Sequence, residues 1–185
     1  MILPLVTLIQ KLTHSVIHPL PFLRTARPTD APAIAALHAR NWQQAYRGDL
    51  PDHYLDVKCP AERLRTWTER FATPNPKMHC AVFEDGGRLA GFCCTFDDYD
   101  AHGAYLDNLH VADEYRGQGL GEQLLRNAAR RVNNPELYLV VLTSNVAAIR
   151  FYERLNARRG AVETRELAGL PVEVVGMHWE TADLL

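Results

Sequence analysis

The spacing of hydrophobic residues along the chain changes several times, and each change predicts a different element. Residues 31–46 and 60–72 carry apolar side chains three and four positions apart, which is typical of amphipathic helices. A short strand is expected before them, at 22–27. Asp85-Gly86-Gly87 is a strong hairpin signal and separates two apolar runs. Strands are therefore expected at 79–84, 88–96 and 104–111.

The second half of the chain also alternates between helix and strand patterns. A helix is expected from the glycines near 117–121 to about Val132, and the next strand, 137–144, is apolar on both faces. Asn145 then offers an N-cap for a short helix. Two strands, near 158–163 and 172–180, end the chain. The order β, α, α, β, β, β, α, β, α, β, β, without a linker or repeat, predicts a single α/β (α+β) domain over residues 22–185.

Composition and charge narrow the class of protein. The chain has 185 residues, 47% hydrophobic and 23% charged, with a net charge of -2, which suits one globular domain with a sizeable core. No basic field indicates nucleic acid or a membrane surface as a partner. Residues 1–21 begin apolar but lack a basic start and are too short to span a bilayer. We expect them to be an N-terminal extension, disordered or packed on a neighbouring subunit.

The cysteines and histidines show no metal-ligand spacing. The four cysteines include no CxxC pair, and the eight histidines include no HxxxH pair. We therefore expect no metal site. The cysteines are interpreted as reduced thiols that act as small hydrophobic side chains in a cytoplasmic protein.

Three glycines, Gly117, Gly119 and Gly121, stand where the third helix begins. A dinucleotide fingerprint fails because Glu122 occupies its third glycine position, and a phosphate-binding P-loop fails because no lysine follows. One remaining interpretation is a helix N-terminus whose amides, together with Arg116, receive a pyrophosphate. The other is tight packing of the helix on the sheet. The glycines alone leave both open.

The surrounding residues carry a family resemblance. "LHVADEYRGQGLGEQLL" resembles the acetyl-CoA signature of the GNAT superfamily of N-acetyltransferases, with Arg116, Gly119 and Gly121 at its fixed positions. "LTSNVAAIRFYERLNA" resembles a second block of the family, and "NWQQAYRGDLPDHYLD" resembles one subgroup. Where the family has Gly-Phe after the last helix, this chain has Asn156-Ala157, and asparagine tolerates the left-handed conformation required there.

The resemblance implies a fold and a cofactor site. The expected fold is a central mixed, mostly antiparallel sheet of about seven strands flanked by about four helices. The sheet is expected to splay between the strands at 104–111 and 137–144, so that the thioester arm of acetyl-CoA lies in the gap. The residues implied in cofactor binding are Leu109, Val111, Arg116, Gly117, Gln118, Gly119, Leu120, Gly121 and Asn145.

The resemblance also implies how protons move when an amine attacks the thioester directly in a ternary complex. Tyr152 matches the tyrosine that protonates the departing thiolate in the family, although a core tyrosine would fit the same helix. Asp107 is the candidate base, because period-two alternation puts it on one face of a strand with Tyr105, Leu109 and Val111. A structural aspartate at a strand edge is the alternative.

The acceptor is expected to be a small-molecule or peptide amine. Its pocket is expected between the first two helices and the loop after the hairpin, where an acidic run could attract a cationic amine. Candidate residues there are Trp42, Tyr46, Asp98 and Tyr105. Two other functions stay open, a non-catalytic acyl-CoA sensor and an interaction module. Because dimers are common in the family, a homodimer is also considered.

Overall fold

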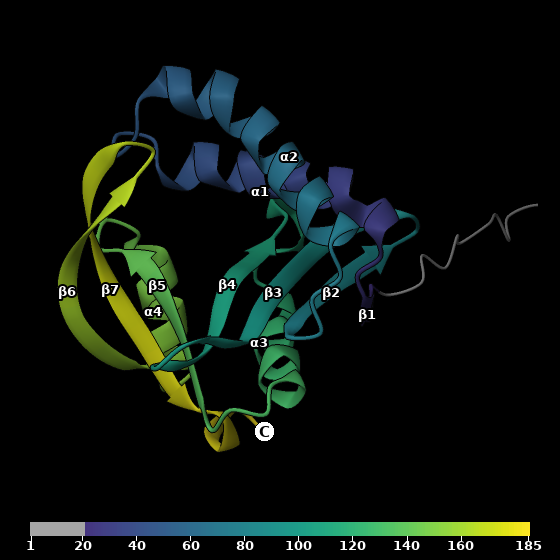
Figure 1. The fold of residues 1–185 in the computed structure, drawn as a ribbon, viewed down its shortest axis with the longest axis vertical. Coiled ribbons are helices and arrows are strands. Elements are labelled where there is room, and N and C mark those ends of the chain that lie inside the picture. Colours follow the sequence, from purple (N-terminus) through teal and green to yellow (C-terminus); the bar gives the residue numbers. More distant parts are fainter. Residues whose placement is uncertain (1–20) are drawn as a thin grey trace, which may run out of the picture.

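The computed structural model describes residues 21–185, so the expected extension over 1–21 lies almost wholly outside the described residues. Seven strands form one sheet in the order β1-β2-β3-β4-β5-β7-β6. Figure 1 shows α1 and α2 together over one face of this sheet and α3 and α4 on the other. The strands are β1 (Phe22–Thr25), β2 (Met78–Asp85), β3 (Arg88–Asp100), β4 (Gly103–Val111), β5 (Glu136–Leu142), β6 (Arg158–Leu167) and β7 (Leu170–Glu180). The helices are α1 (Ala31–Ala45), α2 (Cys59–Ala72), α3 (Leu120–Arg131) and α4 (Val146–Arg154).

The predicted order of elements is confirmed, and so is the mostly antiparallel sheet. Within residues 21–185, β4 and β5 form the one parallel pair of neighbouring strands. They pair over two positions, Ala104 with Leu137 and Tyr105 with Tyr138, and then diverge. The predicted splay is therefore present. Beyond it, the facing edges of β4 and β5 have no ladder partner in this part of the chain.

The alternation of β4 is interrupted at Asp107. Asn108 stands opposite Cys94 and Leu106 opposite Thr95, so Asp107 is the extra residue of a bulge. A bulge turns the following side chains to the other face. Tyr105 therefore shares a face with His110, whereas Leu109 and Val111 lie on the opposite one. The expectation that Tyr105, Asp107, Leu109 and Val111 share a face is wrong for this reason.

Two apolar clusters hold the layers together. The main one joins both helical layers to the sheet and includes fully buried Trp67, Phe92 and Leu124. A smaller one, with Leu142 and Val174, lies near the end of α1. Asn156 ends α4 with a φ of +63°, so the left-handed cap expected at this asparagine is confirmed. No helix within residues 21–185 is long and apolar enough to cross a membrane.

The expectation that all cysteines are reduced thiols is corrected for one pair. Cys80 in β2 and Cys94 in β3 are direct cross-strand neighbours, 4.2 Å apart at Cα, and form a disulfide. The register shifts by one residue between Phe83 and Glu84, and this shift sets Cys80 opposite Cys94 instead of Cys93. Cys59 and Cys93 are free and buried. Burial raises the pKa of the Cys93 thiol to about 12, which keeps that thiol protonated.

Candidate active site

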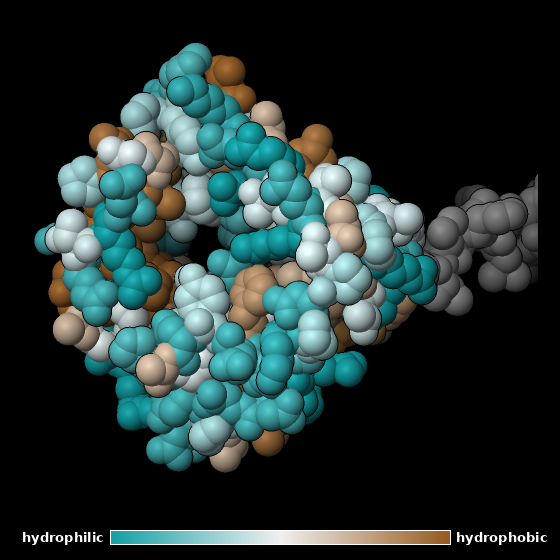
Figure 2. Space-filling view, viewed as in Figure 1, coloured by the Kyte–Doolittle hydropathy of each residue, from teal (hydrophilic) through white to brown (hydrophobic). Residues whose placement is uncertain are grey.

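A cavity of about 1040 Å³ occupies the gap where β4 and β5 diverge. α1 and α2, the beginning of α3, and the β6–β7 hairpin complete its walls. Figure 2 shows an opening through the middle of the molecule, with hydrophobic residues gathered along one side. Leu139, Val141 and Val174 contribute to the apolar lining. The space is large enough for an extended ligand to lie between the two halves of the sheet.

Most of the sequence-predicted site residues line this cavity. They are Trp42, Tyr46, Tyr105, Asp107, Leu109, Val111, Arg116, Gly117, Gly119, Leu120, Gly121, Asn145 and Tyr152. Two predicted residues do not line it. Gln118 is exposed, and its side chain donates a hydrogen bond to the Glu114 carbonyl at 2.9 Å. Asp98 is exposed on β3, so the structure does not support its assignment to the acceptor pocket.

The acidic run around Asp98 has structural partners instead. Asp97 accepts hydrogen bonds from both nitrogens of Asn133, at 2.8 and 2.9 Å, and so holds the turn that leads into β5. Asp100 accepts a 2.6 Å hydrogen bond from the Tyr138 hydroxyl. Two of the three aspartates therefore stabilise the sheet, and the run does not form an anionic wall of the cavity.

The loop before α3 leaves a row of backbone amides without acceptors. Gly117 and Gly119 have φ of +75° and +80°, a region that glycine adopts at little cost. Across 117–122, no backbone N–H donates to a described residue. α4 differs, because the Asn145 side chain accepts a 3.2 Å hydrogen bond from Ala148 N. The uncapped α3 terminus is suited to a diphosphate, since its amides and partial positive charge both favour an anion.

Gly121 and Arg116 complete this end of the cavity in different ways. A Cβ on Gly121 would lie 3.1 Å from Phe151 Cζ, so this glycine permits close packing of α3 on α4. Arg116 is half-exposed and pairs with Asp113 at 2.8 Å. The packing interpretation of the glycine-rich segment therefore applies to Gly121. Gly117 and Gly119 shape the backbone, and Gly121 serves packing.

Tyr152 projects from α4 to the cavity from a buried position. Its ring stands edge-on to Phe151 and Trp179, at 5.1 and 5.7 Å between centroids. Its hydroxyl donates no hydrogen bond to any residue within 21–185. Burial raises the pKa of Tyr152 well above its ordinary value, so the phenol stays protonated at neutral pH. A neutral donor without a fixed partner is therefore available in the cavity.

Asp107 has partners that hold its carboxylate. Oδ2 accepts a 2.6 Å hydrogen bond from Arg70 in α2 and another from the Asn108 side chain. Oδ1 has no partner among the described residues. The bulge brings this carboxylate to the cavity wall, where Arg70 fixes its position.

Two histidines on the cavity wall were not recognised from the sequence. Trp67 Nε1 donates to His38 Nδ1 at 3.1 Å, and Asn41 Nδ2 lies 3.3 Å from His110 Nδ1. The two imidazole rings are 4.7 Å apart. Burial lowers the pKa of His110 to about 3 and that of His38 well below its ordinary value. Their signal was weak, because each is an isolated histidine that belongs to no recognisable motif.

The buried histidine predicts a pH dependence of stability. As the pH falls below the ordinary histidine pKa, this side chain takes up a proton in the unfolded chain. In the folded protein His110 stays neutral until the pH approaches its lowered pKa of about 3. The stabilisation from neutral His110 is thus complete above pH 6.5 and is lost on acidification, by at most about 1.4 kcal/mol per pH unit. In thermal melts from pH 7 to 4.5, His110→Phe should lose less stability than wild type. Surface His53→Phe should melt like wild type, and an unchanged slope in His110→Phe would refute this prediction.

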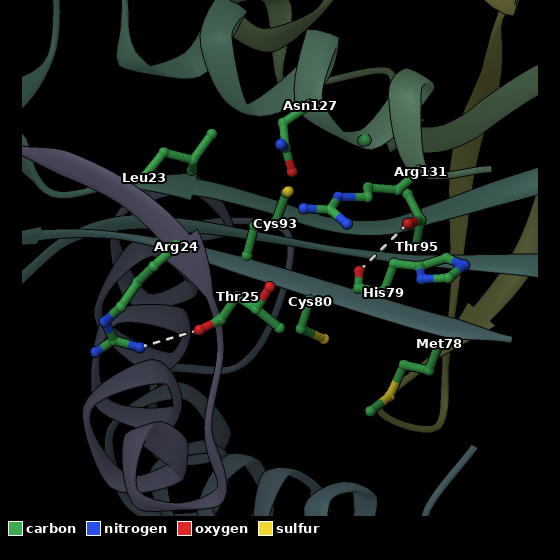
Figure 3. Close-up of a pocket in the computed structure, with 12 residues that line it drawn as sticks. Leu23, Arg24, Thr25, Met78, His79, Cys80, Cys93, Thr95, Asn127 and Arg131 are labelled. Atoms are coloured by element: carbon green, nitrogen blue, oxygen red, sulfur yellow. Dashed lines mark hydrogen bonds between the residues drawn. The ribbon is translucent and has the colours of Figure 1, made fainter. Parts of the chain in front are cut away.

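A second cavity, of about 160 Å³, lies between β1, β2, β3 and α3. Figure 3 shows Cys93 pointing toward Asn127 of α3, whereas Cys80 points away, as strand alternation requires. This cavity is too small for a nucleotide-sized ligand, so the larger one is the candidate site. No cluster of three or more His, Cys, Asp or Glu residues in the described part of the chain could hold a metal.

Comparison with known proteins identifies the class that this fold and cavity define. The family model for the acetyltransferase (GNAT) family matches residues 32–157. The chain therefore belongs to the GNAT family of acetyltransferases. It is similar to thialysine N-epsilon-acetyltransferase of Sus scrofa, with 30% identity over 55% of this chain and 66% of the relative.

Solved structures share the fold. The paia N-acetyltransferase of Thermoplasma acidophilum, in complex with coenzyme A, has a TM-score of 0.65 and 18% identity, covering 84% of this chain and 97% of that one. The yncA protein of Salmonella typhimurium, solved with acetyl-CoA, has a TM-score of 0.64 and 19% identity, covering 88% of this chain and 95% of that one.

Proposed function

We propose that this protein transfers the acetyl group of acetyl-CoA to the primary amine of a small-molecule or peptide acceptor. The observation that carries the proposal is the row of free amides at 117–122, which opens into the gap between β4 and β5. Family membership supports acetyl transfer, and the coenzyme A complex of a relative with the same fold supports the choice of cofactor.

The residues present fit this cofactor. Arg116 and the amides of 117–121 would hold the pyrophosphate at the α3 terminus. Main-chain groups of Leu109 and Val111, on the unpaired edge of β4, would hydrogen-bond the pantetheine arm. The Asn145 amide nitrogen would also reach it, while Oδ1 caps α4.

Direct attack requires one proton to leave the amine and one to reach the sulfur. Acetyl-CoA supplies a thioester whose carbonyl carbon forms the new C–N bond as the C–S bond breaks. Asp107 would accept the amine proton, through water where the carboxylate does not reach. Tyr152 would donate its proton to the departing sulfur, because burial keeps the phenol neutral until negative charge develops beside it. Each transferred proton then has a donor and an acceptor among the groups that line the cavity.

The experiment is a thiol-release assay with acetyl-CoA and a panel of amines. We expect free CoA to appear with at least one acceptor, in equal amount to acetylated amine. Acetyl-CoA binding without thiol release would favour a sensor, and absence of binding would remove the cofactor assignment altogether.

A further inference from the structure

Arg63, on α2, is a largely covered cation without a hydrogen-bonding partner. Its side chain is 18% exposed and lines the large cavity. Its Nε is buried and donates to no atom of the described residues. Its guanidinium carbon stands 4.5 Å from the centre of the Trp42 ring, which fixes it through a cation–π contact. A buried N–H without an acceptor is costly, so the group is suited to a ligand.

Two other arginines with similarly low exposure donate hydrogen bonds to carboxylates, which Arg63 does not. Arg24, 17% exposed, donates to both Asp30 and Glu84. Arg70, 26% exposed, donates to Asp107 at 2.6 Å. The nearest carboxylate oxygen to Arg63 is Glu62 Oε2, at 3.9 Å, and this oxygen already accepts a 2.8 Å hydrogen bond from Tyr54. Arg63 therefore keeps its donors free.

Among the arginines around this part of the cavity, Arg63 lacks an acceptor within the described residues for its N–H groups, although Glu62, 3.9 Å away, offsets its charge. Asp107 is matched by Arg70, and Arg165 by Glu163 at 3.2 Å. Glu166 also lines the cavity but is exposed at the end of β6, where water screens it. The adjacent histidines add no charge, because burial keeps both neutral. A guanidinium with free N–H groups beside an aromatic wall is suited to an anionic group of a ligand.

We propose that Arg63 binds the carboxylate of the acceptor, and hence that the substrate is a free amino acid or a similarly small amine bearing one carboxylate. This inference rests on the proposed acetyl transfer. The planar guanidinium offers a two-pronged donor that matches a carboxylate, and its contact with the Trp42 ring holds it at the cavity wall. Trp42 and Tyr46, 5.1 Å apart, offer an apolar surface for the rest of the acceptor. Guanidinium donors without an acceptor favour an anionic group over a polyamine, contrary to the cationic acceptor suggested by the acidic run.

The test measures binding separately from turnover. Calorimetry on the CoA-saturated protein would compare each common L-amino acid with its carboxamide, and spermidine would serve as a polycation. We expect the best amino acid to bind at least about tenfold more tightly than its amide. In Arg63→Gln this ratio should fall below about threefold, whereas Arg63→Lys should retain part of it. Arg65→Gln, on the exposed side of the same helix, is the matched control and should bind like wild type.

Several results would overturn the assignment. They are equal binding of acid and amide, spermidine binding more tightly than every amino acid, no amino acid binding at all, or an unchanged ratio in Arg63→Gln. A loss of acetyl-CoA affinity in Arg63→Gln would instead assign the guanidinium to the cofactor phosphates. Thiol release measured in the same mixtures separates the two proposals. Carboxylate preference without thiol release would retain the Arg63 site and reject acetyl transfer.

Discussion

Replacing Tyr152 by phenylalanine is expected to lower kcat by about 100-fold, within the range that a positioned general acid contributes. The variant removes only the hydroxyl, so the departing thiolate must take its proton from water. The phenylalanine ring keeps its edge-on packing against Phe151 and Trp179. The KM for acetyl-CoA should change by less than about twofold, because the loss falls on the transition state and not on binding. Thiol release at saturating substrate measures the effect.

The melting temperature provides the control for this variant. The Tyr152 hydroxyl makes no hydrogen bond to the residues described, so its removal leaves no buried group unpaired. Tyr152→Phe should therefore melt within a few degrees of wild type. A kcat within about threefold of wild type would show that Tyr152 is a core residue and not the acid.

The double variant Gly117→Ala, Gly119→Ala is expected to weaken acetyl-CoA binding by about 100-fold. A Cβ at these positive φ angles costs about 1–2 kcal/mol per residue, although both positions have room for it. The free loop relieves this strain by moving, and binding must then restore the left-handed conformation that aligns the amides. If binding must overcome about 3 kcal/mol of backbone strain in total, the affinity for acetyl-CoA falls by roughly 100-fold.

The hairpin between β2 and β3 supplies a matched control. Gly86 and Gly87 also have positive φ, +54° and +83°, with nothing near their Cβ positions, and they do not line the cavity. Gly86→Ala, Gly87→Ala should lose stability without losing acetyl-CoA affinity. If both double variants bind acetyl-CoA as wild type does, the left-handed glycines have no part in cofactor binding.

The arrangement of the elements could be predicted from the sequence because its signals are local. Apolar spacing within each segment, the Asp85-Gly86-Gly87 turn and the Asn145 cap each depend on neighbouring residues alone. The difference in N-terminal capping between α3 and α4 could also be partly predicted from the sequence, since glycines stand at the start of α3 and an asparagine at the start of α4. The splay between β4 and β5 came from the family resemblance, because no local pattern specifies where two strands stop pairing.

The features that the sequence did not predict depend on contacts between distant segments. The bulge at Asp107 is set by the register between β3 and β4, and it moves Tyr105 to the other face. The Cys80–Cys94 pair depends on the register shift between Phe83 and Glu84, because symmetric pairing about the Gly86-Gly87 turn would set Cys80 opposite Cys93. The lack of a hydrogen-bond acceptor for Arg63 depends on the side chains that surround it in the folded protein, which no helical pattern reveals.

Calorimetric titration measures whether the uncapped end of α3 binds the pyrophosphate of acetyl-CoA, as we propose. Acetyl-CoA should bind wild type with a micromolar Kd, on the order of -8 kcal/mol, and Arg116→Glu at least about tenfold more weakly. Arg130→Glu carries the same change of charge at the exposed far end of α3, and should bind like wild type. Absence of heat with wild type, or equal weakening in the two variants, would show that the α3 terminus does not bind the pyrophosphate.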